Sequence, residues 1–215
     1  MNRFQQPLLT SGTIISRMPA FDEIDLKNAP LLAIISANLL ILLTALFQGM
    51  GVGFVLWVYW LQSVIIGFFF ALKILFTARF ANRAKDLMSV MFFAGFFTLH
   101  YGMFHLGYSF FLLLFEGPAP INFAEVLQLG SVFFIAHLIS FILTFREIKS
   151  IEAVGQAFIL PYARIIPMHI TIILGSMLFI LGLGPIPIIL FFLFLKTGAD
   201  IWAHNYEHRL YRKSA

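Results

Sequence analysis

The sequence lacks cysteine and is poor in charged residues, and both absences narrow the class of protein. Only 11% of the 215 residues are Asp, Glu, Lys or Arg, whereas a soluble domain carries about 25% to cover its surface. The absence of cysteine excludes a secreted scaffold held together by disulfides. A hydrophobic fraction of 60%, with 27 phenylalanines, excludes soluble enzymes and disordered tails. The composition therefore indicates a polytopic membrane protein.

Long apolar stretches recur along the chain. A bilayer core needs roughly 20 apolar residues per helix. Six stretches supply them, at 29–49, 52–77, 87–115, 126–145, 164–183 and 186–207. Glycine and proline predict tight turns at 48–51 and 182–185 and a helix-breaking loop at 116–120. The predicted fold class is all-α, a single bundle of six transmembrane helices.

Positive charge is confined to one set of the predicted loops. Lys and Arg precede the first stretch, lie between the second and third and between the fourth and fifth, and follow the sixth. The positive-inside rule then places both termini in the cytoplasm, so that the net charge of +4 reflects topology and not nucleic-acid binding. We expect a cytoplasmic segment 1–28, a transmembrane domain 29–207 and a short basic tail 208–215. The expected localisation is the cytoplasmic membrane, as a multi-pass protein.

Ionisable side chains inside the predicted helices are the candidates for function, because placing charge in a bilayer is costly. All six histidines lie in or beside these helices, and histidine is both a metal ligand and a proton carrier. Counting about 1.5 Å per residue from the cytoplasmic ends gives one common depth for His137, His169, Asp200 and His204. His100 lies deeper in the membrane. The other polar residues expected to be buried are Gln62, Lys73, Arg164 and Lys196.

Asp200 and His204 share one stripe of a helix because they are four residues apart, and Lys196 extends that stripe. A carboxylate and an imidazole so placed can bind one metal ion, or the carboxylate can orient the imidazole as a base. A Lys196–Asp200 ion pair that lowers the cost of burial is an equally good explanation. Pro167 frees a backbone carbonyl and favours an inward-facing His169. His137 by itself is better explained by a hydrogen bond to a neighbouring helix.

Three segments carry a family resemblance. They are 59–62 with Gly67 and Lys73, 97–104, and 164–169 with Gly175, Lys196, Asp200 and His204. Together they resemble an uncharacterised family of small prokaryotic multi-pass membrane proteins, a domain of unknown function. The resemblance implies no activity. It does imply an acidic residue at the position of Gln62, and the amide there argues against a base or metal ligand paired with His100.

A looser similarity is to the zinc-containing membrane hydrolases related to ceramidases and to progestin and adiponectin receptors. Those proteins set histidines and an acidic residue near the cytoplasmic leaflet, as His169, Asp200 and His204 would be here. The analogy is one of arrangement, because those proteins have about seven helices and their serine and histidine motifs do not map onto this chain.

The function favoured by the sequence is a metal-dependent, zinc-like intramembrane hydrolase, although it stays open whether the protein is an enzyme. Zn²⁺ would activate a water molecule, and Asp200 and His100 would take part in catalysis. The metal ligands would be His137, His169, Asp200 and His204. We expect at least three of these four to converge on one cavity, with Lys196 at its rim.

Other functions use the same groups. They would form a relay in a small-solute or proton-coupled transporter, or would only hold helices together in a non-catalytic accessory subunit. Haem b is less favoured, because no two helices carry two histidines each in the pattern of a two-haem bundle. The expected partners are membrane lipids, a lipid or small-molecule substrate and further copies in a homo-oligomer, without nucleic acid. Finally, Gly102 and Gly175 are predicted to lie at close helix–helix contacts.

Overall fold

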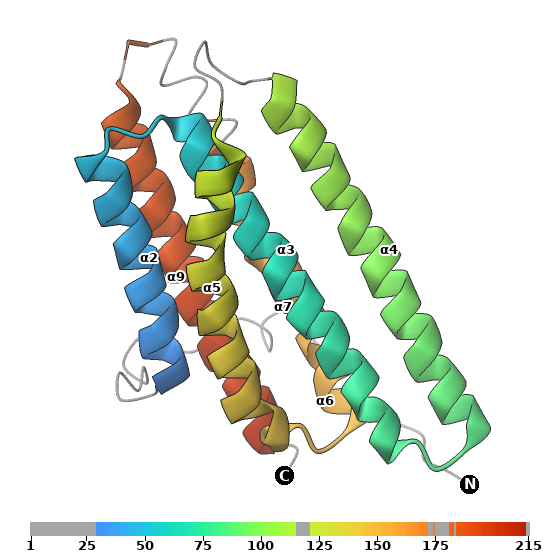
Figure 1. The fold of residues 1–215 in the computed structure, drawn as a ribbon. Helices are drawn as coiled ribbons and strands as arrows, with labels where there is room; N and C mark the ends of the chain where they lie inside the picture. Colours follow the sequence, from blue (N-terminus) through green and yellow to red (C-terminus); the bar gives the residue numbers. More distant parts are fainter. Residues whose placement is uncertain (1–28, 115–120, 172–173, 175–180, 183, 214–215) are drawn as a thin grey trace, which may run out of the picture.

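The computed structural model describes residues 29–114, 121–171, 174, 181–182 and 184–213. Long α-helices dominate these ranges and lie roughly alongside one another (Figure 1). They are α2 (Ala29–Phe47), α3 (Val52–Phe76), α4 (Ala84–Leu114), α5 (Phe123–Thr144) and α9 (Pro185–Lys213). No strand occurs in the described ranges. The predicted all-α class is therefore confirmed.

Five of the described helices are long and apolar enough to cross a membrane. They correspond to the predicted stretches 29–49, 52–77, 87–115, 126–145 and 186–207. The chain is thus a helical membrane protein. Several residues of the remaining stretch, 164–183, lie outside the described residues, as do the predicted loop at 116–120 and the segment 1–28, so the number of spans stays a prediction. α9 continues to Lys213, beyond the predicted end at 207.

The two ends of the bundle differ in charge. α2 begins and α9 ends at the same end, where the connection from α3 to α4 also lies (Figure 1). That connection carries Arg79 and Arg83, whereas the turn 48–51 at the opposite end has no Lys or Arg. Gly49 adopts a φ of 64° in this turn, a conformation that glycine accepts without strain. The predicted tight turn is confirmed.

Short helices follow α3 and α5 and form most of the chain between α5 and Arg164. The 3₁₀ helices η2 (Thr77–Phe80) and η3 (Phe145–Glu147) follow α3 and α5, and α6 (Ile151–Gln156), η4 (Ala157–Ile159) and α7 (Leu160–Ala163) come next. Ser150 caps α6, its hydroxyl accepting a hydrogen bond from the Ala153 N–H at 3.1 Å. Ala153, Ala157 and Leu160 are buried. Residues 146–163 lie between two of the predicted apolar stretches, yet they form a partly buried series of short helices that brings Arg164 into the bundle.

α3 occupies the centre of the bundle, packing against both α4 and α5, while α2 packs against α5 and α9. One apolar cluster joins α2, α3, α5 and α9, where the Tyr59 ring centroid lies 5.0 Å from that of Phe192. A second joins α3, α4 and the α6–α7 stretch around Phe97. On α9, Asp200 lies between the residues of the first cluster and those of the second. The apolar clusters therefore flank a polar interior.

Side chains of neighbouring helices pack closely against Gly67 and Gly130, whereas no described side chain does so at Gly102. A Cβ on Gly67 would lie under 3.0 Å from the Tyr101 ring, and one on Gly130 under 3.0 Å from the end of the Leu61 side chain. A Cβ on Gly102 would meet no described atom within 4 Å. Among the described residues the prediction for Gly102 finds no support, whereas the neighbouring Tyr101 packs against α3 at Gly67. Gly175 lies outside the described residues.

Candidate functional site

Asp200 is fully buried on α9 and accepts hydrogen bonds from side chains of three helices. The Lys196 ammonium donates at 2.6 Å from one turn earlier, the Asn38 amide of α2 at 3.2 Å and the Gln62 amide of α3 at 3.3 Å. Of the two explanations left open by the sequence, the Lys196–Asp200 ion pair is therefore the one present. A carboxylate in an apolar bundle requires such partners, since an unpaired buried charge costs several kcal/mol.

A second ion pair lies two turns further along α9. The Lys73 ammonium of α3 donates to Glu207 at 2.6 Å. The buried Tyr211 hydroxyl donates to the same carboxylate oxygen at 2.9 Å. Asp200 and Glu207 are seven residues apart and thus lie on one face of the helix. This face carries a row of ionisable groups into the interior of the bundle.

Arg164 is buried beside the Lys73–Glu207 ion pair. It follows α7 at the turn before the helical residues 166–171, and only 6% of it is exposed. Its charge acts electrostatically on both Asp200 and Glu207. Within the described part of the chain, however, Arg164 forms no ion pair and its Nε has no hydrogen-bond partner. The guanidinium therefore lies in a polar region without a carboxylate of its own.

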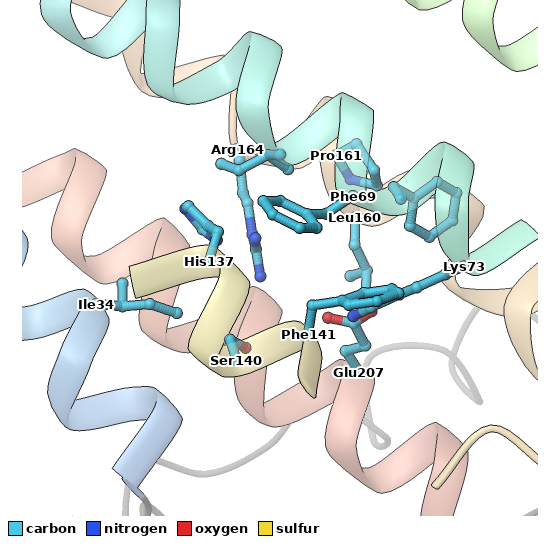
Figure 2. A pocket seen from close by; sticks show the side chains of 12 residues that line it. Ile34, Phe69, Lys73, His137, Ser140, Phe141, Leu160, Pro161, Arg164 and Glu207 are labelled. Carbon is cyan, nitrogen blue, oxygen red and sulfur yellow. The ribbon is translucent and has the colours of Figure 1, made fainter. Parts of the chain in front are cut away.

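A cavity of about 30 Å³ lies beside this guanidinium. Figure 2 shows the Arg164 side chain extending into it from one side, with the His137 ring next to it and Lys73 and Glu207 at the far side. A buried water molecule needs about 10–15 Å³ of such volume, so the cavity accommodates about two. We use the term polar core for the residues that surround Asp200 and this cavity, which are Asn38, Gln62, Lys73, His137, Arg164, Lys196, Asp200, His204 and Glu207.

Two of the predicted histidines belong to the polar core. His137 of α5 and His204 of α9 are 6% and 3% exposed. The Nε2 atom of each has no hydrogen-bond partner among the described residues, and the Arg164 charge acts on both rings. His208, one turn beyond His204, instead contacts Glu147 at 2.7 Å.

The other two histidines lie elsewhere. The His169 ring contacts the Tyr108 hydroxyl of α4 and is exposed. The His100 Nδ1 lies 2.8 Å from the Tyr162 hydroxyl, and both histidines line a groove along α4 that is distinct from the cavity. The chain turns at 164–165 before the helical residues 166–171 begin. With Arg164 directed inward, His169 faces α4.

The described residues give no support to the predicted zinc site. No group of three or more His, Asp or Glu side chains in the described ranges could hold a metal ion. Asp200 is already bonded to a cation and two amides, and His169 and His100 face the outer groove. The expectation that His137, His169, Asp200 and His204 form a metal centre thus finds no support, nor does catalysis by a pair of Asp200 and His100.

Comparison with known proteins identifies the family. The model of a family of unknown function, DUF6498, matches residues 21–215, nearly the whole chain. The chain belongs to this family. The match confirms the resemblance to an uncharacterised domain. No curated protein and no solved structure matches this DUF6498 member significantly.

Three members of the polar core have signals in the sequence that the predicted site does not use. Asn38 is an amide in the middle of an apolar helix, and that isolated polarity was the available signal. Glu207 lies seven residues after Asp200, which predicts the same helical face. Arg164 is predicted to be buried. The helical spacing of Ala153, Ala157 and Leu160 indicates in addition that the segment before it packs against the bundle.

Proposed function

We propose that this protein carries a proton or another small inorganic ion across the cytoplasmic membrane through its polar core. The observation that supports the proposal is a set of charged side chains, two ion pairs and one arginine, around a small cavity inside a bundle of apolar helices. Ionisable groups at such positions are costly and mark ion pathways and proton relays in membrane proteins.

The groups on α9 are spaced to pass charge along the helix. Lys196, Asp200, His204 and Glu207 follow one another at intervals of three or four residues, so each lies about one turn from the next. Asp200 is the central proton-accepting group, with Lys196 stabilising its charged form. His204, whose Nε2 is unpartnered among the described residues, is the next acceptor toward the basic end of the bundle.

The size of the cavity supports an ion as cargo. About 30 Å³ accommodates about two water molecules and excludes a lipid or an amide substrate in this conformation. The orientation we propose has the basic end in the cytoplasm, with both termini there, because the described connections with Lys and Arg lie at that end. Asp200 and Glu207 then lie in the cytoplasmic half of the membrane.

A non-catalytic accessory subunit is the second candidate. Four of the five charged groups are already paired, and paired polar side chains also serve to hold helices together in membranes. In that case the polar core would stabilise the bundle, and no ion would move through it.

The test is ion flux into vesicles. Purified protein is reconstituted into phosphatidylethanolamine and phosphatidylglycerol vesicles that contain the pH-sensitive dye pyranine, and a membrane potential is set with potassium and valinomycin. Parallel vesicles receive gradients of sodium, chloride or fluoride, followed with ion-selective electrodes. We expect flux above that of empty vesicles for at least one of these ions.

The variants separate a pathway from a scaffold. The double variant Lys196→Met/Asp200→Asn removes both charges together and should abolish the flux, while Lys85→Met, at an exposed position, should retain it. Wild-type vesicles that match empty vesicles for every ion would refute the carrier proposal and support the accessory subunit.

A further inference from the structure

Arg164 carries a charge that the rest of the polar core does not neutralise. The polar core contains three cationic side chains, Lys73, Arg164 and Lys196, and two carboxylates, Asp200 and Glu207. Each lysine is 2.6 Å from its own carboxylate. Arginine stays protonated in proteins, so its guanidinium is the excess charge. Leaving such a group buried without a counter-charge is strongly destabilising.

The surroundings of this charge are suited to an anion. The Arg164 Nε and the His137 Nε2 are both buried without a hydrogen-bond partner among the described residues, and both residues line the cavity, as do Lys73 and Ser140. The neutral imidazole can carry its proton on Nε2 and donate it. The one acid in the lining is Glu207, one oxygen of which accepts from both Lys73 and Tyr211.

We propose that the cavity is a binding site for a single halide ion, held by Arg164 and His137. A halide is similar in size to a water molecule, and the cavity has room for about two waters. Nitrate, sulfate and carboxylates have three or more non-hydrogen atoms and are too large. The ion completes the charge balance of the polar core. It accepts a hydrogen bond from the Arg164 Nε and another from the His137 Nε2, and both hydrogen bonds are strong because the acceptor is an ion.

This inference rests on the proposed ion pathway and names the ion as a halide. In that role the halide occupies the cavity beside the Lys73–Glu207 ion pair, and the Glu207 carboxylate in its lining keeps the affinity moderate, as release requires.

The binding test is thermal unfolding in detergent, followed by tryptophan fluorescence. Wild-type protein is exchanged into gluconate buffer and titrated with chloride, bromide or fluoride at constant ionic strength, with sulfate as the salt control. A ligand that binds only the folded state raises the melting temperature as its concentration passes the Kd. We expect a saturable rise with at least one halide and none with sulfate.

Two variants identify the site. His137→Leu should raise the halide concentration for half-maximal stabilisation by about tenfold, the effect of losing one strong hydrogen bond. Arg164→Met should abolish the halide effect, and in gluconate it should melt at or above the wild-type temperature, because the unbalanced charge is gone. If Arg164 had only a structural role, Arg164→Met would instead lower the melting temperature in gluconate. Arg83→Met, at an exposed position, should keep the halide response.

Binding and flux separate the two proposals. Halide stabilisation that depends on Arg164 but is accompanied by no flux would refute the carrier and leave the anion site standing. Flux of protons or cations with no halide stabilisation would refute the anion site and leave the carrier standing. A halide effect of wild-type size in both His137→Leu and Arg164→Met would also overturn the assignment of the site.

Discussion

The Lys196–Asp200 pair should be strongly coupled, so that removing one partner harms the fold more than removing both. The two charges are 2.6 Å apart, and the side chains are each 1% exposed. At an effective dielectric constant of about 20, this separation corresponds to an attraction of about 6 kcal/mol. The loss of that attraction, and not of the hydrogen bonds alone, therefore dominates the effect of a single substitution.

Each single variant leaves a different group behind. Lys196→Met leaves a carboxylate that still accepts from the Asn38 and Gln62 amides at 3.2 and 3.3 Å. Asp200→Asn leaves an ammonium with no carboxylate partner. We expect each to lower the free energy of unfolding by about 3–5 kcal/mol, or roughly 6–20 °C in melting temperature, with Asp200→Asn the worse of the two.

The double variant Lys196→Met/Asp200→Asn should lose less than either single variant, because no charge is left behind and the new amide oxygen can still accept from Asn38 and Gln62. The measurement is a double-mutant cycle of thermal unfolding in one detergent. The control is Lys85→Met, the same chemical change at an exposed position, which should shift stability by no more than about 0.5 kcal/mol. Additive losses from the two single substitutions would refute the coupling argument.

Two further predictions concern packing and topology. Gly67→Leu should lower the melting temperature in detergent, because any side chain there meets the Tyr101 ring. Gly102→Leu should melt like the wild type, because a Cβ there meets no described atom within 4 Å. Equal losses in the two variants would contradict this packing. Reporter fusions in the 48–51 turn and at the C-terminus should report opposite compartments, with the C-terminus cytoplasmic, and a shared compartment would contradict the proposed topology.

Much of the fold follows from composition and periodicity alone. Apolar runs long enough to span a bilayer determine the class and the approximate positions of five described helices, because an apolar surface of that length has no stable alternative in water. Spacing within one helix is equally local. Lys196 and Asp200 are four positions apart, which allows their ion pair whatever the neighbours are. Asp200 and Glu207 are seven positions apart, which puts both on one face.

Only the tertiary structure decided which faces meet. Depth counting placed His137, His169, Asp200 and His204 at one level, but depth does not give the rotation of a helix about its axis. The turn after α7 directs Arg164 inward and His169 toward α4, so the expected metal ligands are separated and an arginine takes the central position. Likewise, the pairing of Lys73 with Glu207 joins residues 134 positions apart. Such contacts depend on the packing of whole helices, which no local spacing encodes.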